Sequence, residues 1–329
     1  MSAVLRVGIV GAGAIAPAHA RGWRDLGAEV INYSLSGAPE LCAQYGLTVA
    51  DSFDQLLDAV DIVDVCTPTL THPELVIAAA QAGKDVVCEK PLALTTARAR
   101  DMIEACRAAG VHLFPAHVVR FTDAYEATHD YVAGGAFGPV AVQRFLRSGG
   151  RPGPERGWFA DPAQSGGLIF DLMIHDIDIA RWMAGDVVRV FARDSATIDN
   201  PDAAVVAHVI MTHTSGAISQ CTASWRAGAE FETRFFISGP GGILSHELGG
   251  HVPFRLQAAP VDVGQPSYVP DGGVAASPYT AELREFLAVL HGEAEPRLTA
   301  DDGLAAIAIV EAAVESTRTG AAVDVEVAA

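Results

Sequence analysis

Two glycines close the first apolar run of the sequence, and they restrict what the N-terminal part of the chain can fold into. Leu5–Val10 is typical of a strand and Ala14–Leu26 of a helix, with Gly11-Ala12-Gly13 between them. In such a unit Gly11 permits a tight turn, Gly13 lets a pyrophosphate approach the backbone, and Ala16 lets the helix pack on the sheet. The N–H groups at the helix start then face the phosphates. We therefore predict a dinucleotide site at Gly11, Gly13, Ala14 and Ile15.

The alternation of strand and helix patterns continues to about Val119. Further strand candidates are Glu29–Tyr33, Thr48–Ala50, Ile62–Cys66, Val86–Cys88 and Val111–Pro115. Strands separated by helices of about 10–15 residues predict a doubly wound parallel sheet, a Rossmann domain. From Val187 to Leu256 the apolar alternation instead predicts a mostly antiparallel open sheet. We expect an α/β protein with a dinucleotide-binding domain at residues 1–119 and a substrate-binding and oligomerisation domain at residues 120–329.

Charge and cysteine usage narrow the possible partners. The net charge of -18 and the pI near 4.9 repel phosphate backbones and anionic membranes, so we expect neither nucleic acid nor a membrane as partner. The five cysteines are scattered among apolar neighbours, which predicts reduced, buried thiols in a cytoplasmic protein. His208, His213, His246 and His251 lack metal-ligand spacing, and we predict no metal site.

The end of the second strand candidate bears on the choice of cofactor. An acidic residue usually binds the adenosine ribose at this point, but the sequence here is Asn32-Tyr33-Ser34-Leu35-Ser36-Gly37. No acidic side chain repels a 2′-phosphate and no basic one attracts it. Ser34 and Ser36 can hydrogen-bond either form. The choice between NAD and NADP therefore stays open, with a slight preference for NADP.

Polar residues at helical spacing interrupt an apolar segment in the second half of the chain. At 100° per residue, Asp171, His175 and Asp178 lie on one face of a helix that starts at Gly166–Gly167 and ends near Ala184. One interpretation is a polar network that pins two domains together. Lys90 favours catalysis instead, because it follows a parallel strand at the edge where open α/β sheets bind ligands. A lysine and a histidine suit the proton transfer that accompanies hydride transfer from an alcohol.

Several motifs together resemble the family of glucose–fructose oxidoreductase, inositol dehydrogenase and MocA. They are Cys66-Thr67-Pro68 with His72, Glu89-Lys90-Pro91, Gly166-Gly167 with Asp171-Leu172-Met173-Ile174-His175-Asp176-Ile177-Asp178, Tyr279…Phe286…Gly292 and Ser316…Gly320. The resemblance implies that Lys90 hydrogen-bonds the reacting oxygen and that His175 is the general acid/base. It implies that Asp171 contacts a neighbouring hydroxyl or orients His175. It also places Thr67, Pro68, His72 and Glu89, with Lys90, around the cofactor, and Glu89 and Pro91 in the loop at the nicotinamide.

Three further residues are weaker candidates for substrate binding. His117 and Arg120 follow the last Rossmann strand and resemble family positions near the substrate, but an interdomain salt bridge or cap would explain them as well. Trp158, next to Phe159, could stack on a sugar ring, although aromatic side chains are common in cores. The loops Ser148–Gly157 and Gly264–Ser277 are expected to determine which substrate binds.

The sequence favours an NAD(P)-dependent dehydrogenase or reductase that acts on a sugar, a cyclic polyol or a sugar derivative. The alternatives are a dinucleotide-binding regulator without activity, and a lyase or glycosidase with an internally recycled nicotinamide. Lys90, Asp171 and His175 together favour the enzyme, since a regulator does not need them. We also expect a homodimer or homotetramer, because the alternating segments Val205–Thr212 and Gly216–Trp225 leave one sheet face without an evident helical cover.

Overall fold

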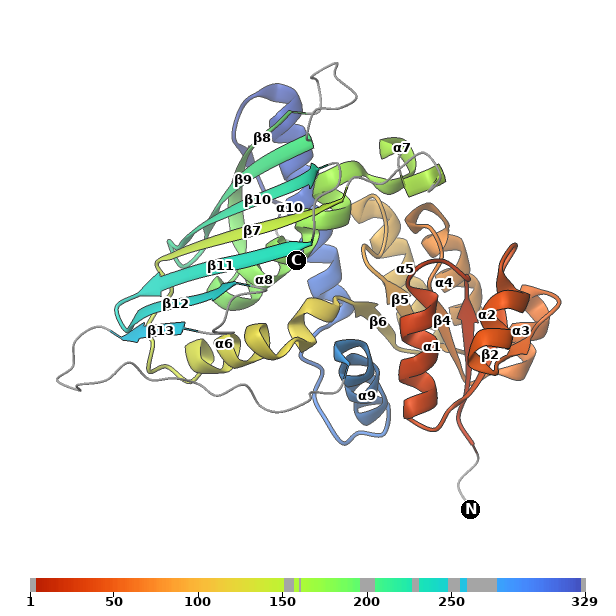
Figure 1. Ribbon diagram of the computed structural model, residues 1–329. Helices are drawn as coiled ribbons and strands as arrows, with labels where there is room; N and C mark the ends of the chain where they lie inside the picture. The colour runs from red at the N-terminus through yellow and green to blue at the C-terminus, as the bar shows by residue number, and fades with distance from the viewer. Residues whose placement is uncertain are drawn as a thin grey trace. The chain divides into compact units, whose positions relative to one another are not determined.

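The chain forms two compact units, which Figure 1 shows in a computed structural model. The structure describes residues 4–150, 157–159, 161–195, 205–226, 231–247, 255–258 and 277–326. Unit 1 comprises Met1–Phe121 and Ala275–Leu304, and unit 2 comprises Thr122–Val274 and Ala305–Ala329. A division at residue 119 alone would assign Ala275–Leu304 to the second domain. This segment returns to unit 1 because the apolar face of its helix is buried in the core there.

Unit 1 is built on a six-stranded parallel sheet, as the sequence predicted. Its strands run in the order β3-β2-β1-β4-β5-β6, which is the Rossmann order. The chain reverses its direction across the sheet between β1 and β4, so the carboxyl ends of these neighbouring strands form the usual ligand crevice. The strands are β1 (Arg6–Val10), β2 (Glu29–Tyr33), β3 (Thr48–Val49), β4 (Ile62–Val65), β5 (Asp85–Glu89) and β6 (Leu113–Ala116).

Helices connect these strands and are held by local signals in the sequence. Ser52 and Thr95 cap the helices that follow them, by accepting hydrogen bonds from the N–H groups of Gln55 and Arg98. The helices of unit 1 are α1 (Ala16–Asp25), α2 (Ala38–Tyr45), α3 (Phe53–Ala59), η1 (Thr69–Thr71), α4 (His72–Gln81), α5 (Thr96–Ala109), η2 (Val118–Phe121) and α9 (Pro278–Leu290).

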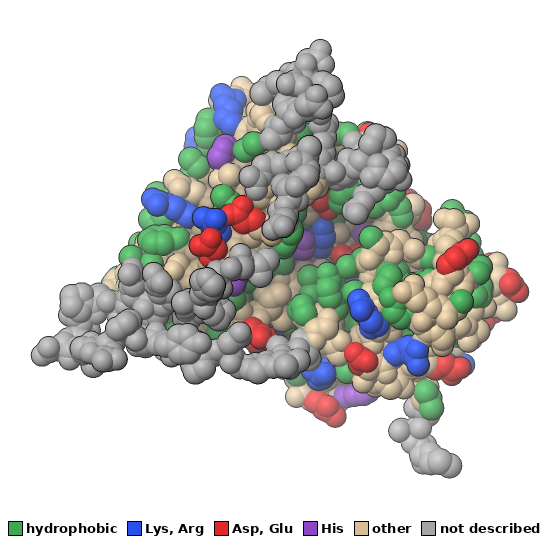
Figure 2. All heavy atoms as spheres, viewed as in Figure 1, with side chains coloured by type: hydrophobic (Ala, Val, Ile, Leu, Met, Phe, Trp, Pro, Cys, Tyr) green, Lys and Arg blue, Asp and Glu red, His purple; other side chains and the backbone are tan. Residues whose placement is uncertain are grey.

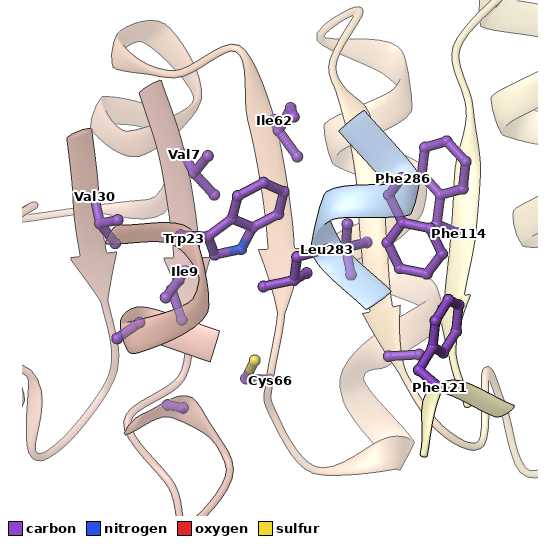
Figure 3. Packing of buried hydrophobic residues seen from close by; sticks show 14 of the residues in the cluster. Val7, Ile9, Trp23, Val30, Ile62, Cys66, Phe114, Phe121, Leu283 and Phe286 are labelled. Carbon is purple, nitrogen blue, oxygen red and sulfur yellow. The ribbon is translucent and has the colours of Figure 1, made fainter. Parts of the chain in front are cut away.

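The core of unit 1 joins the first helix to the last one of the unit. Trp23 of α1 is fully buried beside the apolar residues of β1 and β4, and α9 inserts Leu283 and Phe286 into the same cluster (Figure 3). The ring of Phe286 stacks on Phe114 of β6 with 4.7 Å between the ring centroids. Burial of large aromatic side chains stabilises a core strongly, so α9 is an integral part of the dinucleotide-binding unit.

Unit 2 is built on a mixed, mostly antiparallel sheet, as predicted. Its strand order is β13-β12-β11-β7-β10-β9-β8-β14, and within it β7 pairs with β10 in parallel. The strand β7 lies inside this sheet, because β10 and β11 pair with it on both sides. The strands are β7 (Val142–Gly150), β8 (Val187–Asp194), β9 (Val205–His213), β10 (Ile218–Arg226), β11 (Glu232–Gly239), β12 (Gly242–Glu247), β13 (Arg255–Ala258) and β14 (Val323–Asp324).

Helices pack on one face of this sheet. The helix α8 lies against β7 and β10, and the side chain of Gln143 donates to the carbonyl of Ala180 across that interface. The helices are α6 (Asp123–Ala133), α7 (Pro162–Ser165), α8 (Ile174–Ala184) and α10 (Ala300–Thr319), whose first residues belong to unit 1. The helix predicted from Gly166–Gly167 to Ala184 contains a feature that the sequence did not predict, a π-helical segment at Ile169–Met173.

The opposite face of the sheet presents a mixture of side chains. Phe191, Ile210 and Ile218 are exposed there, beside Arg144 and His208. Figure 2 shows hydrophobic side chains interspersed with charged ones on the visible surface of this sheet.

All five cysteines are buried and unbridged. Within the described ranges, no helix is both long enough and apolar enough to cross a membrane.

Candidate functional site

The glycine turn after β1 has the conformation that the sequence predicted. Gly11 has a φ of +110°, and a β-carbon there would lie 2.7 Å from the carbonyl oxygen of Cys66. Gly13 is exposed, and a β-carbon there would meet no atom within 4 Å. Ile15 provides no side-chain cap to α1. Pro17 has no N–H and the N–H of Ala18 donates to the carbonyl of Ile15, so within the first three residues of the helix only the N–H of Ala16 can serve a ligand. The turn therefore has the open space and the donors that a pyrophosphate requires.

A buried amide that sequence reasoning missed supports this turn. The side-chain nitrogen of Asn32 in β2 donates to the carbonyls of Ile9 at 3.0 Å and Gly11 at 2.8 Å. The N–H of Gly11 in turn donates to the carbonyl of Tyr33. Asn32 shares the buried face of its strand with Val30, two residues earlier. The sequence could have indicated this residue, because Asn32 is a polar residue at a position where the alternation of the strand predicts burial.

Ser34 and Ser36 lie directly beyond β2, the strand that pairs with β1. The N–H of Ser36 is 3.5 Å from the hydroxyl of Ser34, and Leu35 between them is 94% exposed. The segment has no charged side chain from Asn32 to Ala38. No charged side chain of this segment can therefore attract or repel the 2′-phosphate that distinguishes NADP from NAD.

The Thr67–Pro68 turn follows β4 and is tied to the next turn by His72. The two ring nitrogens of this buried histidine face the carbonyls of Thr67 at 2.9 Å and Pro91 at 3.0 Å. Burial lowers the pKa of His72, so the neutral ring donates to one of these carbonyls at a time. Because both ring nitrogens are directed at protein carbonyls, His72 holds the two turns together.

Lys90 extends from the carboxyl end of β5, next to β4 in the same sheet. The side chain of Glu89 is turned into the protein, and its Oε2 accepts the backbone N–H of Lys90 at 2.9 Å. The Lys90–Pro91 peptide bond is cis. Glu89 thus holds the backbone of Lys90 from inside the protein. Lys90 itself is partly exposed at the predicted edge of the sheet.

Behind these turns lies a buried polar cluster that the sequence reasoning missed. His19 of α1 contacts Asp64 at 2.8 Å and Glu89 at 3.0 Å, and the indole of Trp23 donates to Asp64 at 2.6 Å. Glu282 of α9 is fully buried in the same region. Periodicity was the available signal, since His19 recurs at helical spacing with Ala16, Ala20 and Trp23 on the buried face of α1.

His19, Asp64 and Cys66 bring three possible metal donors within 4.8 Å of one another. Both ring nitrogens of His19 are already directed at carboxylate oxygens. Burial would lower the pKa of His19, but the charge and hydrogen bond of Asp64, together with the interactions of Cys66, outweigh burial and raise the pKa well above its usual value. A protonated imidazole has no lone pair for a metal ion. The three groups form a buried charge network of the protein.

Glu282→Gln should stabilise the protein at high pH. Neither carboxyl oxygen of Glu282 has a hydrogen-bond partner, and burial followed by the charge of Glu89 raises its pKa well above the usual range. A raised pKa in the folded state stabilises the fold at low pH, and this contribution is lost as the pH rises above the unfolded value near 4.5. We expect the variant to gain about 1–3 kcal/mol over the wild type at pH 8 and little at pH 4.5.

Urea titrations at both pH values measure this difference. Glu104→Gln is the control, because Glu104 is exposed on α5 and should change stability little at either pH. An equal loss of stability at both pH values in Glu282→Gln would show that the folded protein holds this carboxyl group ionised.

In unit 2, Asp171 and His175 lie on either side of the transition from π-helix to α-helix. Asp171 belongs to the π-helical segment and His175 to the first turn of α8, and both are partly exposed. Asp178, the third residue of the predicted stripe, is instead buried. Short π-helical turns are rare and occur frequently at functional sites. This local geometry favours Asp171 and His175 as the residues that meet a ligand.

A buried ion pair holds the helix that carries His175. Arg147 of β7 and Asp176 are both almost fully buried, with 2.8 Å between Nη2 and Oδ1, and Nε lies 3.2 Å from both carboxylate oxygens. This ion pair lies within unit 2, one residue along from His175, so it differs from the interdomain network of Asp171, His175 and Asp178 that the sequence left as an alternative. The pair fixes α8 to the sheet, and with it the position of His175.

The remaining substrate candidates have different surroundings. Arg120 is buried, and its guanidinium donates to the carbonyl of Arg297 at 2.7 Å and lies 3.5 Å from Asp302. These contacts lie within unit 1 and favour a structural role over a substrate contact. His117 is also buried, and Trp158 is partly exposed and packs edge-on against Phe159. Residues 151–156 and 264–276 of the two candidate specificity loops lie outside the described residues.

Comparison with known proteins places these features in context. Residues 5–117 match the model of an oxidoreductase family with a NAD-binding Rossmann fold, GFO/IDH/MocA, and residues 125–245 match the C-terminal domain of the same family. D-apiose dehydrogenase of Paraburkholderia graminis is 31% identical over 97% of this chain and 89% of its own length. Myo-inositol 2-dehydrogenase of Thermotoga maritima is 30% identical over 98% and 99%. GenD2 from gentamicin A biosynthesis, solved in complex with NAD, is 26% identical over 99% and 97%, with a TM-score of 0.83.

Proposed function

The chain belongs to the GFO/IDH/MocA family of NAD-binding oxidoreductases, and from this premise we propose that it transfers a hydride between nicotinamide and a hydroxyl-bearing or keto carbon of a sugar, cyclic polyol or sugar derivative. The observation that carries the proposal is the position of Lys90. It stands at the carboxyl edge of the sheet whose first strand ends in the glycine turn, with only β4 between the two strands. Relatives named as dehydrogenases of apiose and inositol support the substrate class.

The proposed roles follow from the chemistry of an alcohol that loses a hydride. NAD(P), when bound, accepts or returns that hydride. The hydroxyl group must lose its proton as the carbon is oxidised, and an ammonium or imidazole group can stabilise the developing oxygen charge and carry the proton. Lys90 hydrogen-bonds the reacting oxygen, and either Lys90 or His175 carries the proton. Asp171 binds a neighbouring hydroxyl group or orients His175.

Both forms of the cofactor should be accepted. Binding donors are supplied by the glycine turn and by Ser34 and Ser36, and these neutral groups discriminate weakly against a 2′-phosphate. We expect a preference below about a thousandfold, or about 4 kcal/mol, with NADP slightly favoured. A relative solved with NAD supports acceptance of the unphosphorylated form.

A substrate panel tests the proposal directly. Aldoses, keto-sugars, inositols and other polyols are offered with NAD⁺, NADP⁺, NADH and NADPH, and the absorbance at 340 nm is followed. Stoichiometric consumption of free cofactor with at least one compound is the expected result. Product formed without net cofactor turnover would identify the chemistry as that of a lyase or glycosidase. Cofactor binding without turnover on any compound would favour a regulator.

We further propose that the protein acts in the cytoplasm as a homodimer or homotetramer, joined through the open face of the sheet in unit 2. Exposed Phe191, Ile210 and Ile218 on that face would gain from burial. The polar side chains around them are typical of the rim of an interface. The centre of an interface is more apolar than the rest of the protein surface, but its rim is not. The buried, unbridged cysteines suit a reducing compartment.

Ile210→Asp should convert the assembly to monomers. A carboxylate at the centre of a buried apolar patch would be desolvated without a partner, which costs several kcal/mol by general estimates. Light scattering should give a multiple of 34.4 kDa for the wild type and a single 34.4 kDa species for the variant. Val314→Asp is the control, because Val314 is similarly exposed but lies on α10. A monomeric wild type at micromolar concentration would contradict the proposal.

A further inference from the structure

His19 occupies a fixed position between two strands of unit 1. It lies on the buried face of α1 and is fully inaccessible to solvent. Its Nδ1 is 2.8 Å from an oxygen of Asp64 in β4, and its Nε2 is 3.0 Å from Oε1 of Glu89 in β5. A protonated imidazole donates at both nitrogens, so a single ring can satisfy both carboxylates. The first helix is thereby linked to the ends of two strands at the edge of the glycine turn.

Glu89 carries this link to Lys90. While Oε1 faces His19, Oε2 accepts the backbone N–H of Lys90 at 2.9 Å. Both oxygens of the carboxylate are therefore held, and the carboxylate cannot rotate without breaking one bond. The next residue, Pro91, has its carbonyl 3.0 Å from His72. The backbone on either side of the Lys90 side chain is thus restrained by two buried histidines.

We propose that His19 is a positioning residue for Lys90, which it orients through the carboxylate of Glu89. The inference rests on the proposed function only in assuming that Lys90 takes part in turnover. His19 touches neither the lysine side chain nor any group that would meet the substrate, and its effect is transmitted by two hydrogen bonds. Misplacement of a reacting group by about 1 Å can lower a rate by about 100-fold, so a buried residue in this position can affect turnover.

The charges around His19 are consistent with this role. The groups that face it are Trp23 on its own helix, Asp64 of β4, Cys66 directly after β4, Glu89 of β5, and Tyr279 and Glu282 of α9. Burial would raise the pKa of Glu89, but the hydrogen bond and charge of His19 outweigh burial and lower it. The pair is therefore an imidazolium and a carboxylate at neutral pH. A neutral substitute for His19 should loosen Glu89 and the bond it accepts from Lys90.

The same network contains its own control. Trp23 donates to Asp64, on the side of His19 that leads away from Lys90. Trp23→Phe removes that donor and leaves the contact between His19 and Glu89 in place. If the network only stabilises the fold, His19→Gln and Trp23→Phe should both lower turnover only by reducing the fraction of folded protein. A positioning role predicts that His19→Gln alone alters the properties of Lys90.

The composition of the chain allows Lys90 to be observed directly. Lys84 and Lys90 are the only lysines in the sequence, so protein labelled with ¹⁵N-lysine gives two backbone amide signals, and Lys84→Arg assigns them. His19→Gln should shift the Lys90 amide upfield, since its acceptor becomes less tightly held, and leave the Lys84 amide in place. Trp23→Phe should shift neither signal. Glu89→Gln, which keeps an acceptor oxygen but loses the charge, should reproduce the shift if His19→Gln does not fold.

Kinetics complete the test. With a substrate from the panel, His19→Gln should lower kcat about 10- to 100-fold, change the dissociation constant of NAD(P)H less than about threefold, and alter the pH profile of kcat. Trp23→Phe should keep wild-type kcat per folded molecule. An unshifted Lys90 amide, or equal kcat in His19→Gln and Trp23→Phe, would overturn the positioning role. If instead Lys90→Met turns over normally, the proposed catalytic role of Lys90 fails, while the amide signals still decide whether His19 orients Lys90.

Discussion

Lys90→Met lowers kcat by a factor of about 10²–10⁴ and leaves the affinity for the dinucleotide nearly unchanged. Methionine retains the length and the apolar stem of lysine but can neither donate to the reacting oxygen nor carry its proton. The backbone N–H of residue 90 can still donate to Glu89, so the turn that follows β5 keeps its hydrogen bond. The loss should therefore appear in the chemical step, with the melting temperature within a few degrees of the wild type.

Lys84 provides a matched control for this result. It is the other lysine of the chain, and its Nζ donates to the carbonyl of Val60 at 2.8 Å, at the opposite end of β5. Lys84→Met should affect stability slightly and turnover per folded molecule not at all. Near-normal turnover in Lys90→Met would remove this lysine from the mechanism. A large fall in melting temperature with preserved turnover would assign it to the fold.

His175→Ala should give a comparable loss of kcat, and the two losses should not add. Residues that serve one proton transfer act as a unit, so the double variant should be little slower than the slower single variant. Arg147 and Asp176 hold α8 independently of the imidazole, so the variant should stay folded. Multiplicative losses in the double variant would show that Lys90 and His175 act in separate steps.

The architecture of unit 1 could be predicted because its sequence carries strong local signals. Apolar strands, helical periodicity and the glycine turn each indicate the same structure, and the sheet has the predicted order of elements. The place of α9 could not be predicted in this way. Its apolar face, with Leu283 and Phe286, indicates a buried helix but does not specify which core receives it. That choice depends on packing between residues far apart in the sequence.

The π-helical segment shows a second limit of periodicity. At 100° per residue Asp171, His175 and Asp178 share a face, but the extra residue in a π-turn rotates the chain before α8 begins. The π-turn changes only the relation of Asp171 to His175. His175 and Asp178 both lie in α8, so the burial of Asp178 beside a partly exposed His175 comes from what packs against each side of that helix. The sequence of this segment has no glycine or proline between Leu168 and Ala184 that would signal the change. The wider turn arises from how the helix fits against the sheet.

The sequence predicted those site residues that lie in the turns after strands. It did not predict the buried polar residues behind these turns. Lys90 and Gly13 follow strands and were found by position. His19, Asp64 and Glu282 lie inside regular elements, where a polar residue on a buried face is the only signal. An isolated buried charge is costly, so His19 pairs with Asp64 and Glu89, whereas Glu282 has no hydrogen-bond partner and its pKa is raised. The partners come from three separate elements, so the network emerges only from the tertiary structure.

Gly13→Val should abolish dinucleotide binding without unfolding the protein. A β-carbon at Gly13 meets no protein atom within 4 Å, and its backbone does not require a glycine, so the folded chain accepts the side chain. The space that valine fills is the space through which a pyrophosphate would approach the N–H groups of the turn. We expect the dissociation constant of NAD(P)H to rise at least about 100-fold, or about 2.8 kcal/mol, with the melting temperature of the free protein nearly unchanged.

Gly11→Ala is the informative contrast, because the turn needs a glycine at the two positions for different reasons. Its β-carbon would lie 2.7 Å from the carbonyl of Cys66 on a backbone with a φ of +110°, so this variant should lose stability whether or not cofactor is present. Fluorescence titration with NADH and melting curves with and without cofactor separate the two effects. A saturating ligand stabilises the wild type by about 2.7 kcal/mol at 100 times its dissociation constant, and Gly13→Val should lose that gain. If Gly13→Val binds the dinucleotide with wild-type affinity, the pyrophosphate binds elsewhere. If the variant has a lower melting temperature without cofactor, the fold itself needs the space beside Gly13.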